Sequence, residues 1–167
     1  AFRILTTSMQ YVLAGIQNRS KDNTTIYVTS TVKGEGKTFT AFNLALTLCE
    51  GNNRVVIVGA DLRNPQLQRY EEGAKQLKGV SDFIASEDES IMSYINRSKL
   101  HSNLSVVTSG SIPPNPSELL KNSKIDKLFT ELKGLFDYVI VDTAPAMLVA
   151  DTFLINRFAD LTLYVAR

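Results

Sequence analysis

The sequence predicts an α/β fold with a doubly wound, mainly parallel sheet flanked by helices. Two observations predict it: five short β-branched runs alternate with helical stretches, and a glycine-rich turn joins the first run to a helix. The runs are almost continuously apolar, as expected of strands that are buried on both faces of a parallel sheet. Ligands of such sheets bind at the carboxyl ends of the strands, so the functional residues are expected there.

The expected elements follow one another in order along the chain. Residues 2–16 read as an amphipathic helix, with residues 20–23 as its exit. Strands are expected over residues 25–30, 54–59, 104–109, 138–142 and 161–166. Helices are expected over residues 38–50, 123–135 and 148–158, and Gly51 is a stop signal for the first of these. No repeat, low-complexity tract or linker interrupts them, so residues 1–167 are expected to form a single domain.

Composition sets the broad class of the protein. Eighteen basic and seventeen acidic residues give a net charge of +1, which argues against non-specific attraction to nucleic acid or to an anionic membrane. Cys49 is the one cysteine, so an internal disulfide and a cysteine metal cluster are excluded, and a reducing cytoplasm fits. No apolar run approaches the roughly 20 residues that span a bilayer. The chain opens at Ala1 without a signal peptide and is expected to be a piece of something longer.

The glycine-rich turn lies in the segment TIYVTSTVKGEGKTFTAFNLAL, between a strand and a helix. Gly34 and Gly36 permit backbone conformations that bring N–H groups against phosphate oxygens, and the helix N-terminus adds its dipole there. Lys37 is placed to reach the β- and γ-phosphates, and the Thr38 hydroxyl to ligate Mg²⁺. The usual G-x-x-x-x-G-K-[ST] pattern would put its first glycine at Thr31, so the turn has a variant KGxGKT form. The context predicts a P-loop NTPase fold that binds a nucleoside triphosphate.

Two aspartates follow strands where the nucleotide is expected. Asp142 closes the run YVIVD and is a Walker B candidate that reaches Mg²⁺ directly or through water. Asp61 lies just past the run RVVIVG, in GADLRNP. Phosphoryl transfer needs a group that orients or deprotonates the attacking oxygen, and both carboxylates are expected to point into the phosphate crevice. Arg63 has two open interpretations: a group that neutralises transition-state charge, or a surface ion pair.

With these residues in place, the chain resembles the bacterial tyrosine kinases, the cytoplasmic kinase domains or subunits of capsule and exopolysaccharide export systems. AFRILTTSMQYVL is similar to the first helix of that family, TSTVKGEGKTFTAFNLA to its variant Walker A motif, and GADLRNPQL to its Walker A′ segment. FDYVIVDTAPAMLVAD resembles the Walker B strand and the loop after it. SGSIPPNPSELL, residues 109–120, is the most family-specific stretch.

The resemblance implies an ATP-dependent tyrosine autokinase that regulates capsular or exopolysaccharide synthesis and export. It implies ATP or ADP with Mg²⁺ as cofactors, Lys37, Asp61 and Asp142 as catalytic residues, and Thr38, Asp61 and Asp142 as metal ligands. The implied nucleotide-binding residues are Lys33, Gly34, Glu35, Gly36, Lys37, Thr38 and Phe39. Asp61 is also expected to help deprotonate the acceptor tyrosine.

The resemblance also implies partners and a location. The partners are a membrane-embedded polysaccharide co-polymerase or activator domain, the tyrosine-rich C-terminal tail of neighbouring subunits, and other copies of the chain; nucleic acid is not among them. The implied location is cytoplasmic, tethered to the bacterial inner membrane. The closing helices and the tyrosine-rich tail of the family are expected beyond residue 167, so the acceptor tyrosines are not expected within this sequence.

The chain departs from the family pattern in two further places. Gly59 stands where the Walker A′ segment usually carries a first aspartate, which leaves Asp61 alone. In the first helix the family pattern is E-x-x-R-x-x-R; Arg3 matches the first arginine, Thr6 occupies the second, and the initial glutamate would precede Ala1. That helix forms the subunit interface of the family, so these substitutions bear on assembly.

Two other functions remain open at this point. A ParA/MinD-like ATPase switch is favoured by Lys33, because such switches use a lysine there to reach the nucleotide of a dimer partner. A nucleotide-binding scaffold with little kinase activity is favoured by Gly59 and Thr6.

The sequence also predicts which side chains are buried. Among the tyrosines, Tyr27, Tyr138 and Tyr164 lie in strand runs and are expected in the core, whereas Tyr70 and Tyr94 are candidates for exposure. In the helix expected over residues 38–50, the apolar residues at helical spacing are Phe39, Phe42, Ala45, Leu46 and Cys49.

Overall fold

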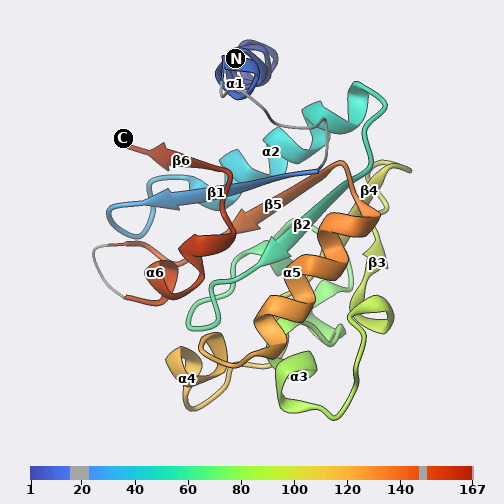
Figure 1. The fold of residues 1–167 in the computed structure, drawn as a ribbon, viewed down its shortest axis with the longest axis vertical. Helices are drawn as coiled ribbons and strands as arrows, with labels where there is room; N and C mark the ends of the chain where they lie inside the picture. Colours follow the sequence, from blue (N-terminus) through green and yellow to red (C-terminus); the bar gives the residue numbers. More distant parts are fainter. Residues whose placement is uncertain (16–22, 147–149, 167) are drawn as a thin grey trace.

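A computed structural model describes residues 1–15, 23–146 and 150–166. Its centre is a six-stranded sheet with the strand order β3-β4-β2-β5-β1-β6 (Figure 1). The strands are β1 (Thr24–Ser30), β2 (Val55–Gly59), β3 (Asn96–Arg97), β4 (Leu104–Val107), β5 (Tyr138–Asp142) and β6 (Leu161–Val165). All neighbouring pairs are parallel except β3 and β4, which are antiparallel. The predicted mainly parallel α/β sheet is confirmed.

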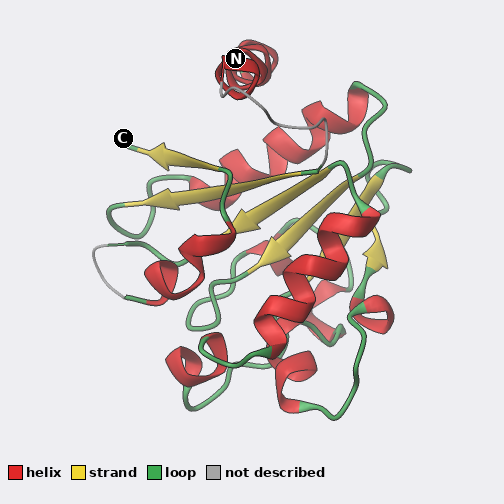
Figure 2. Cartoon of the chain, in the orientation of Figure 1, coloured by secondary structure: helices red, strands yellow, loops and turns green. Residues whose placement is uncertain are grey.

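Helices connect the strands and cover both faces of the sheet (Figure 2). The α-helices are α1 (Phe2–Gly15), α2 (Lys37–Glu50), α3 (Val80–Ala85), α4 (Pro116–Leu120), α5 (Lys124–Leu135) and α6 (Asp151–Ile155). Four 3-10 turns complete the described elements: Leu67–Arg69, Ala74–Gln76, Met92–Tyr94 and Asn156–Phe158. Among the described residues, no helix is both long enough and apolar enough to span a lipid bilayer.

The core has two halves because residues of a strand alternate between the faces of the sheet. On one face, Val56 and Val58 of β2 pack with apolar residues of α3, α4, α5 and α6. On the other face, Val55 and Ile57 pack with α2, and Met9 of α1 joins this half. Burial on both faces explains why β2 consists of Val55, Val56, Ile57, Val58 and Gly59, all buried.

The register of the sheet brings the loops that follow β1, β2 and β5 to the same edge. Asp142, the last residue of β5, pairs with Val28 of β1 on one side and with Gly59 of β2 on the other. The turn after β1 leads into α2, and the turn after β2 carries Asp61. Segments that are far apart in sequence therefore meet at the carboxyl ends of β1, β2 and β5, which is where the site was expected.

The structure corrects four expectations about elements and burial. A sixth strand, β3, was not predicted. In β6 the exposed and less exposed residues alternate, so it is not buried on both faces, and Tyr164 is 57% exposed rather than in the core. Tyr94 is buried, packed edge-on against Phe83, rather than exposed. In α2, Phe39 is 52% exposed and Leu46 is partly buried, whereas Phe42, Ala45 and Cys49 are buried as expected.

Parts of two expected elements lie outside the described residues. The predicted first helix ends at residue 16, which lies outside the described residues. Of its predicted exit over residues 20–23, only residue 23 is described. The predicted helix over residues 148–158 begins within residues 147–149; the described part holds α6 and the 3-10 turn Asn156–Phe158.

Candidate functional site

The turn between β1 and α2 has the backbone of a phosphate loop. Gly34 and Gly36 have φ angles of 93° and 92°, a left-handed conformation that side chains with a Cβ rarely adopt. Gly36 directly precedes α2, so the first N–H groups of that helix open into the turn. Glu35 stabilises the turn, because its carboxylate accepts a hydrogen bond of 3.1 Å from the backbone N–H of Val32.

Lys37 extends from the start of α2 between two buried carboxylates. Its Nζ atom lies 3.6 Å from Oδ2 of Asp61 and 4.0 Å from Oδ1 of Asp142. The exposed fractions of the three side chains are 9%, 4% and 2%. Charges removed from water are stabilised by a partner of opposite sign, so the ammonium group and the two carboxylates hold one another in place.

Asp142 is the more deeply buried of the two acids and is also bound to the P-loop. The hydroxyl of Thr38 donates a hydrogen bond of 2.7 Å to Oδ2 of Asp142, whereas Oδ1 has no hydrogen-bond partner. Burial raises the pKa of Asp142 to about 6, and the charge of Lys37 and the hydrogen bond from Thr38 oppose that rise. The negative charge of the Asp142 carboxylate is therefore only partly compensated by Lys37 and Thr38. This favours the binding of a further positive group.

The oxygens at this edge fit a magnesium ion that is shared with a phosphate. Thr38 and Asp142 offer a hydroxyl and a carboxylate, and the buried Oδ1 of Asp142 has no hydrogen-bond partner, with Nζ of Lys37 4.0 Å away. Within the described part of the chain, no group of three or more His, Cys, Asp or Glu side chains could hold a metal ion by itself. Mg²⁺ commonly takes one or two carboxylates and completes its shell with waters and substrate phosphates.

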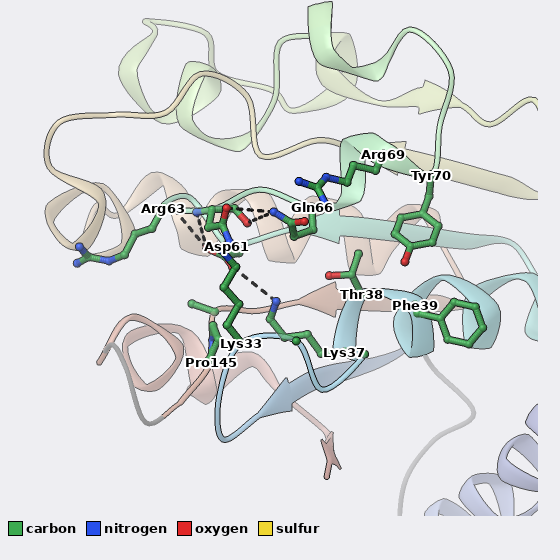
Figure 3. Close-up of a pocket in the computed structure, with 14 residues that line it drawn as sticks. Lys33, Lys37, Thr38, Phe39, Asp61, Arg63, Gln66, Arg69, Tyr70 and Pro145 are labelled. Atoms are coloured by element: carbon green, nitrogen blue, oxygen red, sulfur yellow. Dashed lines mark hydrogen bonds and ion pairs between the residues drawn. The ribbon is translucent and has the colours of Figure 1, made fainter. Parts of the chain in front are cut away.

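A cavity of about 500 Å³ opens over the P-loop (Figure 3). One wall is the P-loop with the start of α2, and the opposite wall is the segment after β2. Lys33, Gly34, Gly36, Lys37, Thr38, Phe39, Asp61, Arg63, Asn64, Gln66, Arg69, Tyr70, Ala144 and Pro145 line it. Its volume is typical of a pocket for a small organic ligand or cofactor.

Arg63, for which the sequence left two interpretations open, lines the cavity and forms an ion pair. Its Nε atom lies 2.6 Å from Oδ2 of Asp151, and its guanidinium also donates to Oγ of Ser117 at 2.7 Å. Figure 3 shows the guanidinium directed away from Lys37. Asp151 is 2% exposed, so Arg63 forms an ion pair with a buried acid.

The structure brings most of the sequence-predicted site residues together. Lys33, Gly34, Gly36, Lys37, Thr38, Phe39 and Asp61 line the cavity, and Asp142 lies beneath it in contact with Thr38 and Lys37. Glu35 is not among the lining residues and acts on the turn itself. Sequence reasoning missed the opposite wall, above all Gln66, Arg69 and Tyr70, and gave no role to Ser117 or Asp151. The last two lie in the quoted segments PPNPSELL and MLVAD, so the signal was the family-specific segments and not a local motif.

Comparison with known proteins connects this site to named relatives. Residues 23–160 match the family described as the AAA domain. The chain is 32% identical over 151 residues to the tyrosine-protein kinase CpsD of Streptococcus agalactiae, an alignment that covers 89% of this chain and 63% of that protein. It is 33% identical over 167 residues to the putative tyrosine-protein kinase EpsB of Ralstonia solanacearum, covering 100% of this chain and 21% of that protein. The chain thus spans less than two thirds of the length of these relatives.

Solved structures give the same result at the level of the fold. The kinase domain of the Escherichia coli tyrosine kinase ETK superposes with a TM-score of 0.88 and 29% identity, over 100% of this chain and 62% of that chain. The septum site-determining protein MinD of Pyrococcus horikoshii, solved with Mg-ADP, superposes with a TM-score of 0.71 and 21% identity, over 86% of this chain and 58% of that chain. The second likeness is a likeness of fold alone, whereas the first agrees with the curated relatives in sequence as well.

Proposed function

This chain belongs to the bacterial tyrosine kinases, and on that premise we propose that it transfers the γ-phosphoryl group of ATP to protein tyrosines. The observation that carries the proposal is the position of Lys37, within 4.0 Å of two buried carboxylates at the end of a phosphate loop. The names of CpsD, EpsB and ETK as tyrosine kinases support the choice of acceptor. We propose that residues 1–167 form a single nucleotide-binding domain.

We propose that the P-loop binds the phosphates of ATP. The N–H groups of residues 34–38 would surround the β- and γ-phosphate oxygens, and Lys37 would exchange part of its contact with Asp61 for those oxygens. Lys33 and Phe39 lie at the exposed rim of the cavity, where they would contact the outer part of the nucleotide. Glu35 would keep the turn closed through its bond to Val32.

The transfer step needs a base for the acceptor. The phenolic oxygen attacks the γ-phosphorus, the bond from that phosphorus to the β–γ bridging oxygen breaks, and ADP leaves. Asp61 is assigned the phenolic proton, because it lines the cavity and its carboxylate is held by the backbone N–H groups of Arg63 and Asn64 at 3.3 and 3.0 Å. Mg²⁺, when bound by Thr38, Asp61 and Asp142, supplies positive charge to the phosphate oxygens. Lys37 stabilises the charge that develops on the leaving oxygens.

The wider role follows the family. We propose that the kinase regulates the synthesis or export of a capsular or extracellular polysaccharide from the cytoplasmic side of the bacterial inner membrane. Its proposed partners are a membrane-embedded activator, fused or separate, and the tyrosine-rich tail of a neighbouring subunit.

A nucleotide-dependent switch of the MinD type is the second candidate, and Lys33 is the observation in its favour. Lys33 is exposed at the rim of the cavity, where it is free to reach toward a second molecule. The likeness to MinD is nevertheless weaker in both sequence and superposition than the likeness to ETK.

Phosphotyrosine formation by the full-length protein with Mg-ATP tests the proposal. Lys37→Met and Asp61→Asn should both lose the signal, and Lys127→Met and Asp126→Asn on the exposed side of α5 are matched controls that should keep it. If the wild-type protein binds Mg-ATP without forming phosphotyrosine, the kinase proposal fails. ATP-dependent dimerisation that Lys33→Ala abolishes would then support the switch.

A further inference from the structure

The site holds a second ionic cluster on the far side of Asp61 from Lys37. Arg63 contacts both carboxylate oxygens of Asp151, through Nε at 2.6 Å and a terminal nitrogen at 3.3 Å. Ser117 completes the cluster: its hydroxyl donates to Oδ1 of Asp151 at 2.6 Å and accepts from Arg63 at 2.7 Å. Both carboxylate oxygens of Asp151 therefore have hydrogen-bond partners, as a buried carboxylate requires.

The three members of the cluster come from segments that are distant in sequence. Arg63 lies in the turn after β2, Ser117 in α4 and Asp151 at the start of α6. The side chain of Asp151 is 3% exposed, whereas that of Arg63 is 43% exposed. A planar guanidinium that binds a fixed carboxylate through two nitrogens is held in orientation as well as in position. The cluster therefore fixes the backbone at Arg63 relative to α4 and α6.

The backbone of Arg63 contacts Asp61, the proposed base. The backbone N–H of Arg63 donates to Oδ1 of Asp61 at 3.3 Å, and the next N–H, of Asn64, donates to the same oxygen at 3.0 Å. The other oxygen of Asp61, Oδ2, faces Lys37 at 3.6 Å. The orientation of the Asp61 carboxylate thus depends on where the backbone of Arg63 and Asn64 is held.

We propose that Arg63 is a positioning residue: its ion pair with Asp151 and Ser117 fixes the turn after β2, and this turn aims the carboxylate of Asp61 at Lys37 and the cavity. The inference rests on the proposed function of Asp61 as the base. It assigns the guanidinium no contact with the phosphates, in contrast to an arginine that stabilises the transition state directly. Ser117 and Asp151, which line no part of the cavity, become necessary for phosphoryl transfer through this contact.

Kinetics of the full-length protein separate a positioning role from a direct one. Arg63→Ala, Arg63→Lys and Asp151→Asn should each lower kcat about 10- to 100-fold while the KM for ATP changes less than about two-fold, because a displaced base affects the transfer step rather than binding. Arg63→Lys should not rescue, since an ammonium group cannot form the two-nitrogen contact. The double variant Arg63→Ala/Asp151→Asn should be no slower than the slower single variant, because the two residues act as one unit. Arg157→Ala is the control: it removes another arginine–aspartate pair, with Asp126 at 3.1 Å, on the exposed surface.

Two results would overturn the inference. If Asp151→Asn keeps or raises kcat while Arg63→Ala lowers it, the freed guanidinium acts directly on the phosphates. If all variants lose thermal stability but keep the kcat of the folded fraction, the cluster supports the fold alone.

A spectroscopic measurement keeps the inference separate from the kinase proposal. The amide resonance of Asn64 reports its hydrogen bond to Asp61, so it should shift in Asp151→Asn and stay in place in Arg157→Ala. If the wild-type protein lacks kinase activity but Asp151→Asn still shifts this resonance, the proposed function is wrong and the positioning contact stands. An Asn64 resonance that is unchanged in Asp151→Asn and in Arg63→Ala would refute the positioning contact whatever the activity.

Discussion

Thr38 and Asp142 are 104 residues apart in sequence and are joined by a hydrogen bond of 2.7 Å from the threonine hydroxyl to a carboxylate oxygen. The bond links the first turn of α2 to the end of β5, and it leaves the other oxygen of Asp142 without a hydrogen-bond partner. A hydroxyl and a carboxylate in this contact form a ready pair of oxygen ligands beside the phosphate loop.

The first prediction concerns the hydroxyl of Thr38. Thr38→Val should reduce the gain in ADP affinity that Mg²⁺ provides, by about 10-fold or more, whereas Thr38→Ser should keep most of it, because serine retains the hydroxyl at the same position. Titration calorimetry with Mg²⁺ and with EDTA measures the gain for each variant. An equal gain in wild type and Thr38→Val would exclude the hydroxyl from the metal site.

The second prediction concerns the ammonium group of Lys37. Lys37→Met should weaken ADP binding about 10- to 100-fold, because a charged hydrogen bond to the phosphates is lost. Lys127→Met, on the exposed part of α5, is the matched control and should bind like wild type. Direct binding of a fluorescent ADP analogue measures both variants, and unchanged affinity in Lys37→Met would refute the role.

The third prediction follows from the burial of Asp142. Its pKa is raised from 3.8 to about 6 in the folded protein, so between these values the folded chain holds a proton that the unfolded chain has released. The contribution of Asp142 to the stability of the protein therefore falls as the pH rises through this window, and the charged carboxylate remains destabilising at pH 7. Asparagine imitates the neutral acid, so Asp142→Asn should be more stable than wild type by about 3 kcal/mol at pH 7.

Urea unfolding of the nucleotide-free protein measures this difference, which should shrink as the pH is lowered toward 4. Asp126→Asn alters an exposed acid and should show no gain at pH 7. A wild-type protein that equals or exceeds the stability of Asp142→Asn at pH 7 would contradict the raised pKa.

The fourth prediction concerns the glycine that replaces the first Walker A′ aspartate of the family. A Cβ atom at Gly59 would lie 2.5 Å from Oγ of Ser109 and 2.9 Å from its backbone nitrogen, both closer than side-chain atoms approach. Gly59→Ala should therefore destabilise the protein by about 1–3 kcal/mol, and Gly59→Asp by at least as much. The carboxylate cannot be restored by this one substitution, because Ser109, in the segment that follows β4, occupies the space.

Adding Ser109→Gly should recover part of the loss, since it removes the hydroxyl but leaves the backbone contact. Gly134→Ala, in α5 with open space around its Cα, is a control that should not destabilise. A stable Gly59→Ala variant would show that β2 and β4 separate easily.

The strands, the main helices and the phosphate loop were predictable because each depends on neighbours in sequence. The β-branched runs, the glycines at 34 and 36 and the helix that begins at Lys37 form patterns that a local window contains. The errors fall where distant contacts decide. The strand β3 has two polar residues and exists through its pairing with β4. Tyr94 is buried because Phe83 packs on its ring and its hydroxyl donates a hydrogen bond of 2.5 Å to Asp88.

The burial of Tyr164 was predicted wrongly for a different reason. An apolar strand run reads as a central strand, but β6 pairs with β1 alone among the described strands, and its side chains remain half exposed. Propensity reports that a segment is extended and carries no information on its place in the sheet.

The sequence by itself determined that this chain has a phosphate loop, because the glycines, Lys37 and Thr38 are adjacent and the backbone conformation is local. It also determined which two aspartates end strands beside that loop. The tertiary structure decided what each charge faces: Lys37 lies between Asp61 and Asp142, and Arg63 pairs with Asp151, 88 residues away. Partners at such separations are set by strand order and by packing of α4 and α6, and the energy of an ion pair depends on that geometry and burial rather than on residue type.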